Sequence, residues 1–217
     1  MLKKALLFDF DLTLADSSQG IFQCVNYAMK QLGFQAYNYY IVKNVIGHPL
    51  PDTFKLLTGN GNAEKAKEFT TLFVEHADKV MNNNTFIFPE VFDVIPKMKE
   101  RGFQLGIVST KYRYRIAGIL ERDNLIEYFD LIIGGEDVKE HKPNPEGLFL
   151  AIQKLGVDKN EVFYIGDTLI DAETAQRAEV DFIGVLTGTT TMLDFQSQNV
   201  TNIIKDLNFL SAKIKGH

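Results

Sequence analysis

Two carboxylates near the amino terminus are the side chains best suited to chemistry. Asp9 and Asp11 follow the apolar run 5–8 and are separated by one residue, with Thr13 two positions further on. Charge at the end of a buried segment is costly unless it is compensated, and two close carboxylates raise each other's pKa. A hard divalent cation, which prefers oxygen ligands, would compensate both. We therefore expect phosphoryl transfer in which a carboxylate near the cation attacks phosphorus.

The two aspartates would then have different roles. Asp9 is the expected nucleophile, which would form an aspartyl phosphate. Asp11 is the expected acid/base, which would protonate the leaving oxygen and then activate water.

Five later side chains could complete such a site. Ser109, with Thr110 beside it, could donate hydrogen bonds to phosphoryl oxygens, and Lys142 could neutralise phosphate and keep the nucleophile ionised. Asp167 is the expected second metal carboxylate because it follows an apolar run and a glycine. Asp171 comes one helical turn later and could face the same cation.

The elements that must position these residues read as an α/β fold. Short continuous apolar runs alternate with helical patterns, which indicates a doubly wound parallel sheet covered on both faces. We expect strands at 5–8, 104–108, 131–133, 162–165 and 182–185, helices at 91–101, 112–123, 145–155 and 170–178, and one last helix in an exposed tail at 202–214. In such folds the site lies beyond the carboxyl ends of the strands.

The stretch after the first strand has a different pattern. Helical periodicity covers about 20–32, 39–46, 51–57 and 63–81, and we see no convincing strand between Asp16 and Asn84. We therefore expect a core formed by residues 1–15 and 84–217 and an all-helical domain, residues 16–83, inserted into it.

Taken together, these residues resemble the four motifs of the haloacid dehalogenase-like hydrolase superfamily, in that family's order. The resemblance covers essentially the whole chain and is carried by Asp9-Phe10-Asp11-Leu12-Thr13-Leu14, Ser109, Lys142 and Gly166-Asp167-Thr168-Leu169-Ile170-Asp171. It implies a Rossmann-like core with a helical cap. It also implies Mg²⁺ held by the carboxylates of Asp9 and Asp167 and the backbone carbonyl of Asp11, with Asp171 close by.

Within this superfamily the chain looks most like phosphoglycolate phosphatase-type enzymes, on the residues Ala15-Asp16-Ser17 and Lys142-Pro143-Asn144-Pro145-Glu146. The family usually has glycine after the second aspartate, whereas this chain has Leu12, and a bulky residue disfavours positive φ. The implied substrate is a small phosphorylated metabolite, a phosphoglycolate-like compound or a sugar phosphate.

Other interpretations remain open. Each motif alone is more often a helix cap or a surface residue, but all four at strand ends disfavour that explanation. A phosphomutase similar to β-phosphoglucomutase would share both aspartates and the metal. A phosphoacceptor receiver module also uses acidic residues, a hydroxyl and a lysine, but its acceptor follows a middle strand. His48, in a rigid turn of the expected cap, is a candidate substrate contact.

Composition limits the partners. The net charge of −5 and the scattered lysines and arginines disfavour nucleic-acid binding, and no segment is apolar enough to span a membrane. The lone cysteine, Cys24, excludes an internal disulfide framework. Asp9 and Asp11 interrupt the short apolar start too early for a signal peptide, so we expect a cytoplasmic location. A monomer and a homodimer are both compatible with the sequence.

Overall fold

The computed structural model describes residues 2–214 and divides into two compact units. Unit 1 comprises Met1–Ala15 with Ile87–His217, and unit 2 comprises Asp16–Phe86. The strands β2 (Ala15–Asp16) and β3 (Phe86–Ile87) pair with each other where the chain leaves and re-enters unit 1.

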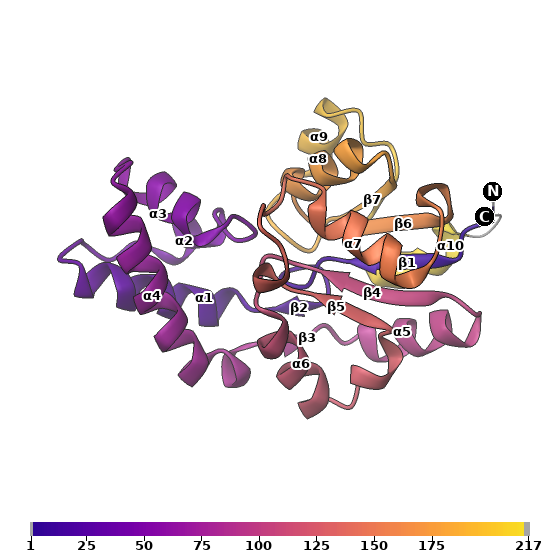
Figure 1. Ribbon diagram of the computed structural model, residues 1–217, viewed down its shortest axis with the longest axis horizontal. Helices are drawn as coiled ribbons and strands as arrows, with labels where there is room; N and C mark the ends of the chain where they lie inside the picture. The colour runs from indigo at the N-terminus through magenta and orange to yellow at the C-terminus, as the bar shows by residue number, and fades with distance from the viewer. Residues whose placement is uncertain (1, 215–217) are drawn as a thin grey trace. The chain divides into compact units, whose positions relative to one another are not determined.

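Unit 1 is built on one parallel sheet of six strands (Figure 1). Their order across the sheet is β5-β4-β1-β6-β7-β8, so the amino-terminal strand lies inside the sheet. The strands are β1 (Ala5–Phe8), β4 (Gln104–Val108), β5 (Leu131–Ile133), β6 (Val162–Gly166), β7 (Asp181–Val185) and β8 (Ile203–Ile204). The expected α/β fold with a parallel sheet is confirmed.

Helices cover both faces of this sheet, which explains why its central strands are apolar throughout. Leu6 and Phe8 of β1 point into a core closed by α5, α6 and α10, and Ala5 and Leu7 point into a second core closed by α7 and α8. The helices are α5 (Val91–Glu100), α6 (Arg113–Arg122), α7 (Glu146–Leu155), α8 (Leu169–Ala178), α9 (Met192–Ser197) and α10 (Leu210–Lys213).

The carboxyl-terminal segment differs from expectation. Residues 202–214 are not one exposed helix but contain β8, a short 3₁₀ turn (Leu207–Phe209) and α10. Leu207, Leu210 and Ile214 are fully buried in the core beside α5, so this segment is an integral part of unit 1. The helix α9, capped by Thr191, was also not expected.

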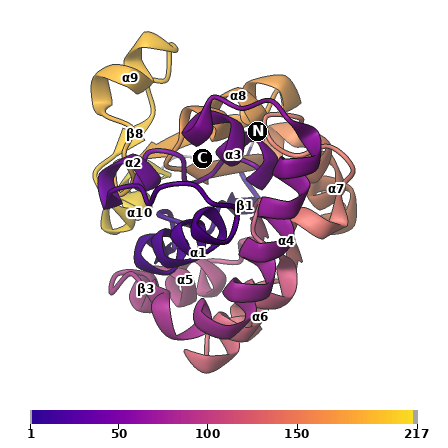
Figure 2. The same ribbon diagram turned by 90° about the vertical axis from the view of Figure 1, so that its left-hand side faces the viewer.

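Unit 2 has its own apolar core and no contribution from the six-stranded sheet. Its helices are α1 (Ser18–Gln31), α2 (Tyr39–Lys43), α3 (Leu50–Thr58) and α4 (Ala63–Val80). The helix α4 packs against α1 and α3, as Figure 2 shows. Buried side chains from α1, α3 and α4, among them Met29, Phe54 and Phe69, form a core of their own.

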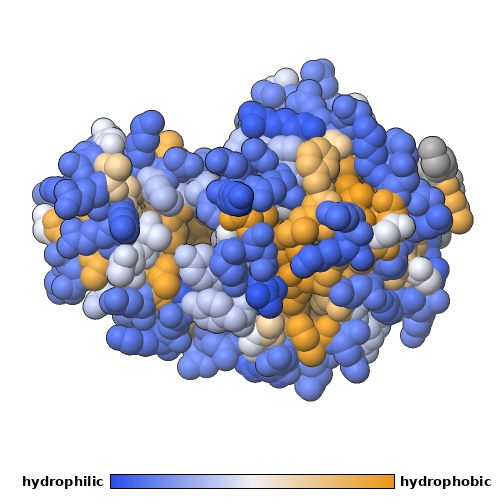
Figure 3. All heavy atoms as spheres, viewed as in Figure 1, coloured by the Kyte–Doolittle hydropathy of each residue, from blue (hydrophilic) through white to orange (hydrophobic). Residues whose placement is uncertain are grey.

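The visible surface is mostly hydrophilic, with an apolar area on unit 1 over β5 and α7 (Figure 3). β5 is an edge strand, so its outer side has no neighbouring strand. Within residues 2–214, no helix is both long enough and apolar enough to cross a membrane.

Candidate active site

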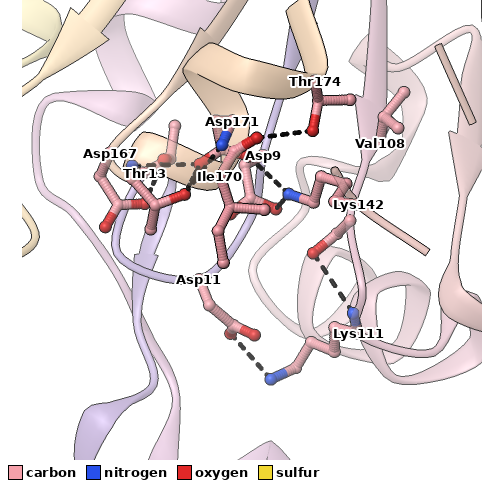
Figure 4. Close-up of polar contacts among 12 residues, drawn as sticks. Asp9, Asp11, Thr13, Val108, Lys111, Lys142, Asp167, Ile170, Asp171 and Thr174 are labelled. Carbon is pink, nitrogen blue, oxygen red and sulfur yellow. Dashed lines mark hydrogen bonds and ion pairs between the residues drawn. The ribbon is translucent and has the colours of Figure 1, made fainter. Parts of the chain in front are cut away.

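Three buried carboxylates meet beyond the carboxyl ends of β1 and β6 (Figure 4). Asp9 follows β1, Asp167 follows β6, and Asp171 lies in the first turn of α8. One oxygen of each lies within 4.8 Å of the others, and none of the three residues is more than 1 % exposed. Because β1 and β6 are parallel neighbours, residues far apart in sequence meet at one edge of the sheet.

Lys142 is the cation that faces this cluster. Its Nζ lies 2.6 Å from Oδ1 of Asp171 and 3.0 Å from Oδ1 of Asp9. Burial lowers the pKa of Lys142, but the charges of Asp171 and Asp9 outweigh that effect and hold the pKa well above its usual range. Lys142 is therefore a fixed positive charge.

Asp171 is fully engaged by the protein. Its Oδ2 accepts hydrogen bonds from the backbone N–H of Thr168 (3.1 Å) and from its hydroxyl (2.5 Å), in a capping box at the start of α8. Its Oδ1 accepts from Lys142 at 2.6 Å and from Tyr164 at 2.8 Å. With both oxygens occupied, Asp171 holds Lys142 in place more readily than it can ligate a cation directly.

Tyr164 lies in the middle of β6 and contacts both members of this pair. Its hydroxyl accepts a hydrogen bond from Lys142 (3.1 Å) and is within donating distance of Asp171 and, at 3.1 Å, of the carbonyl of Val108. Burial first, and then the charge of Asp171, hold the pKa of Tyr164 well above its usual range. Tyr164 is thus a neutral support for the lysine.

Asp167 is enclosed on its other side. The hydroxyl of Thr13 donates to its Oδ1 at 2.9 Å. Gly188 approaches so closely that an added Cβ would lie 1.9 Å from Oδ2 of Asp167, so this position has no room for a side chain. Burial, followed by the charges of Asp171 and Asp9, holds the pKa of Asp167 well above its usual range.

Asp9 has an oxygen that pairs with an ammonium but lacks a hydrogen bond. Its Oδ1 is buried and, despite the nearby ammonium, makes no hydrogen bond of good geometry to the described residues. Burial is the main reason that the pKa of Asp9 rises to about 6, and Lys142 only partly opposes it. The two buried carboxylates Asp9 and Asp167, with one oxygen of Asp9 lacking a hydrogen bond, fit a hard cation such as Mg²⁺, which takes carboxylate oxygens and would stabilise their ionised forms.

Asp11 is directed away from the three-carboxylate cluster, as Figure 4 shows. Its Oδ1 accepts from Nζ of Lys111 at 2.8 Å, and both side chains are at least nine-tenths buried. Lys111 follows β4 and also donates its backbone N–H to the hydroxyl of Ser109 at 3.4 Å. The two aspartates of the first loop therefore occupy distinct environments, one facing the cluster and one facing a lysine.

The other two expected contacts differ in position. The hydroxyl of Ser109 is close enough to Asp9 to contribute a small lowering of the Asp9 pKa. Thr110 is half-buried, and its carbonyl faces Gly135, where an added Cβ would lie 2.5 Å away. His48 belongs to unit 2, so its expected contact with substrate stays a prediction.

Comparisons with known proteins identify the family of this chain. Residues 6–185 match the family model described as haloacid dehalogenase-like hydrolase. The chain belongs to this family. The expected resemblance is confirmed, and the matched residues extend from β1 through β7.

Named relatives of this haloacid dehalogenase-like hydrolase are phosphatases. Pyrophosphatase PpaX from Oceanobacillus iheyensis is 33 % identical over 207 residues, which cover 94 % of each chain. A phosphoglycolate phosphatase from Escherichia coli is 26 % identical over 85 % of this chain and 82 % of its own length. These relatives and the family match confirm the expectation of a phosphatase enzyme.

Solved structures agree with the fold. The crystal structure of a haloacid dehalogenase-like hydrolase from Bacteroides fragilis is 43 % identical, with a TM-score of 0.93 over 96 % of this chain and 99 % of that one. A protein from Clostridium acetobutylicum also has a TM-score of 0.93 over the full length of both chains, at 23 % identity. The second likeness concerns the fold alone.

Leu12 of this hydrolase occupies the left-handed backbone region. Its φ is +61°. Glycine, which has no Cβ, adopts this conformation without a steric penalty, whereas leucine does not. The leucine side chain is only 2 % exposed, and the hydroxyl of Thr187 donates to its carbonyl at 2.5 Å. Burial and this hydrogen bond hold the loop that carries Asp9 and Asp11 in its turn.

Three residues of the hydrolase site had no role in the prediction from sequence: Thr13, Lys111 and Tyr164. Thr13 and Lys111 follow the ends of β1 and β4, so the rule that found Asp9 and Ser109 places them at the same edge of the sheet but does not indicate what they contact. Tyr164 lies inside an apolar strand and carried no such signal.

Proposed function

We propose that this enzyme is a Mg²⁺-dependent phosphatase that hydrolyses a small phosphorylated metabolite through an aspartyl phosphate. The observation that supports this most is the pairing of a buried, incompletely satisfied carboxylate, Asp9, with a fixed ammonium, Lys142. Unit 1 would carry the chemistry and unit 2 would act as the cap that selects the substrate.

In the first step an oxygen of Asp9 attacks phosphorus. The bond from phosphorus to the leaving oxygen breaks, the electron pair stays on that oxygen, and Asp11 supplies the proton it needs. Lys142 and the Ser109 hydroxyl would stabilise the negative charge on the peripheral phosphoryl oxygens. The product is an alcohol, or inorganic phosphate from an anhydride, and a phosphorylated Asp9.

In the second step the ionised Asp11 accepts a proton from water. The water oxygen attacks phosphorus, the bond between phosphorus and the Asp9 oxygen breaks, and inorganic phosphate leaves. Asp9 returns to its ionised form and Asp11 to its protonated form, so the cycle is balanced. The separation of Asp11 from the cluster suits this role, since Asp11 must face the leaving group and the water.

The residues that would hold Mg²⁺ are Asp9 and Asp167 through their carboxylates and Asp11 through its backbone carbonyl, with Asp171 completing the anionic surroundings. When bound, the ion would supply charge stabilisation to the phosphoryl group and to the crowded carboxylates. The raised pKa of Asp9 and of Asp167 supports this fit. It indicates that the cationic side chains of the protein do not fully balance the negative charge of these two carboxylates.

The substrate class follows from the relatives. Pyrophosphatase PpaX and the phosphoglycolate phosphatases are named after small phosphate compounds, pyrophosphate and phosphoglycolate. We infer a substrate of similar size for this chain. His48 of unit 2 would contribute to substrate contact. We also propose a cytoplasmic enzyme, monomeric or homodimeric, without a nucleic-acid or membrane partner.

Replacing the nucleophile tests the mechanism. Asp9→Asn should abolish release of inorganic phosphate from p-nitrophenyl phosphate, while circular dichroism shows a folded protein. Asp130→Asn is a matched control, because Asp130 precedes β5 at the opposite edge of the sheet and pairs with Lys99 there. EDTA should stop wild-type turnover and Mg²⁺ should restore it.

Two outcomes would contradict the proposal. Near-wild-type turnover by the Asp9→Asn variant would exclude an aspartyl phosphate. Transfer of the phosphoryl group between hydroxyls of a sugar phosphate, without release of inorganic phosphate, would identify a mutase.

A further inference from the structure

Lys111 is a buried cation that the phosphoryl chemistry described above leaves unused. It is 8 % exposed, and its Nζ lies 2.8 Å from Oδ1 of Asp11. Figure 4 shows the pair set apart from the Asp9, Asp167 and Asp171 cluster. An ammonium has three N–H donors, and the carboxylate of Asp11 uses one of them, so Lys111 retains capacity to bind a ligand.

Other buried lysines are committed elsewhere. Within the described residues, the buried lysines are Lys3, Lys111 and Lys142. Lys142 contacts Asp9 and Asp171 in the cluster, and Lys3 bonds to Asp181 and to the carbonyl of Val162 at the amino-terminal edge of the sheet. Of these three, only Lys111 lies beside the acid/base.

The position of Lys111 relative to the reaction follows from its partner. In the proposed function Asp11 protonates the leaving oxygen, so its carboxyl group must lie within hydrogen-bond distance of that oxygen. Lys111 is hydrogen-bonded to the same Asp11 carboxylate, so its ammonium lies next to the part of the substrate that carries the leaving oxygen. In that arrangement Lys111 lies beside the leaving group.

We propose that Lys111 recognises a second negative charge on the leaving group. The preferred substrate class is then a phosphate ester or anhydride whose leaving group carries a carboxylate or phosphate adjacent to the bridging oxygen. A charge-assisted hydrogen bond in a buried site is stronger than one between neutral groups. This inference rests on the proposed function, because it needs Asp11 to be the residue beside the leaving oxygen.

Two substrates of similar size separate this role from a purely structural one. The compounds are 2-phosphoglycolate, with a carboxylate on the leaving group, and 2-hydroxyethyl phosphate, with a neutral hydroxymethyl group in its place. We expect wild-type kcat/KM to favour the carboxylate compound by about 10- to 100-fold, the range for one hydrogen bond to a charged group. Lys111→Met should bring the two values within about threefold of each other, and Lys111→Arg should retain most of the preference.

Matched controls make the result specific. Lys159→Met removes an equal charge from an exposed pair with Glu179 before β6, at the opposite edge of the sheet, and should leave the substrate preference unchanged. If Lys111 only orients Asp11, Lys111→Met will lower kcat/KM equally for both compounds and preserve their ratio, which overturns the proposal.

Wild-type measurements keep the proposal falsifiable should Lys111→Met fail to fold by circular dichroism. Equal wild-type kcat/KM for the two compounds overturns it without any variant. Failure of the proposed function looks different: p-nitrophenyl phosphate and both test compounds would then release no phosphate with Mg²⁺. Turnover of p-nitrophenyl phosphate without any preference for the anionic compound rejects the role of Lys111 alone.

Discussion

At position 12, the usual order of stability, in which an alanine variant is more stable than a glycine variant, should be reversed. Leu12 combines a φ of +61° with a side chain that is 2 % exposed. Leu12→Ala would lose the buried side chain, at a cost of about 2–5 kcal/mol, and would keep the left-handed strain of about 1–2 kcal/mol. Compared with Leu12→Ala, Leu12→Gly also loses the remaining methyl group and makes the unfolded chain more flexible, which together lower the free energy of unfolding by about 1 kcal/mol. Glycine, however, releases the left-handed strain. We therefore expect Leu12→Gly to be at least as stable as Leu12→Ala.

Leu14 supplies the matched comparison. It is fully buried in the same loop and is absent from the residues with positive φ. There, glycine has no strain to release and should be less stable than alanine by about 1 kcal/mol. The preference for glycine over alanine should thus be about 1–2 kcal/mol greater at Leu12 than at Leu14.

Urea unfolding of the four variants, followed by circular dichroism in the presence of EDTA, would measure this difference. EDTA removes any contribution of bound metal to the free energy of unfolding, and a constant m-value allows the midpoints to be compared. If alanine is favoured over glycine at Leu12 by the same margin as at Leu14, the backbone argument is refuted.

Four further outcomes can be measured. Because the pKa of Asp9 is raised from 3.8 to about 6, the folded metal-free protein binds a proton that the unfolded chain releases. The raised pKa of Asp9 therefore contributes up to about 3 kcal/mol to the free energy of unfolding below about pH 4, and this contribution is lost as the pH rises through about 6. Thermal unfolding in EDTA should show a weaker pH dependence for Asp9→Asn than for the wild-type protein. Mg²⁺ needs the ionised carboxylate, so calorimetric titration should find weaker binding at about pH 5 than at about pH 7.5. Tyr164→Phe removes hydrogen bonds to Lys142 and Asp171, and steady-state kinetics should show kcat reduced about tenfold with KM little changed; an unchanged kcat would deny Tyr164 a positioning role. His48→Ala should raise KM for the true substrate several-fold, and unaltered kcat and KM would remove His48 from the substrate site.

The parallel sheet could be predicted because its physical cause is visible in the sequence. Strands covered on both faces are apolar throughout, and β1 and β6 are short runs of this kind. The carboxyl-terminal segment departs from the prediction for an equally physical reason. Leu207, Leu210 and Ile214 have helical spacing, but tertiary contacts override it, because Ile203 and Ile204 pair with Gly184 and Val185 and the leucines fill the core.

The candidate site also contains residues that could be predicted from the sequence and residues that could not. Asp9, Ser109 and Asp167 could be found because each follows an apolar strand, and the topology brings strand ends together. Tyr164 could not, because within a strand its ring reads as one more apolar residue. The partners of its hydroxyl, Lys142 and Asp171, come from a loop and a helix whose approach only the folded structure defines.

The insertion of unit 2 directly after the first loop has a consequence for biosynthesis. β1 is an interior strand, yet its neighbours β4 and β6 are translated only after the whole of unit 2 has emerged. Unit 2 has a core of its own and can form first, and the pairing of β2 with β3 would then hold its two ends together. A folded insertion closed in this way reduces the entropy lost when β1 meets β4. Asp9, the proposed nucleophile, precedes unit 2 in the chain and would thus reach its final surroundings only after Asp171 has left the ribosome.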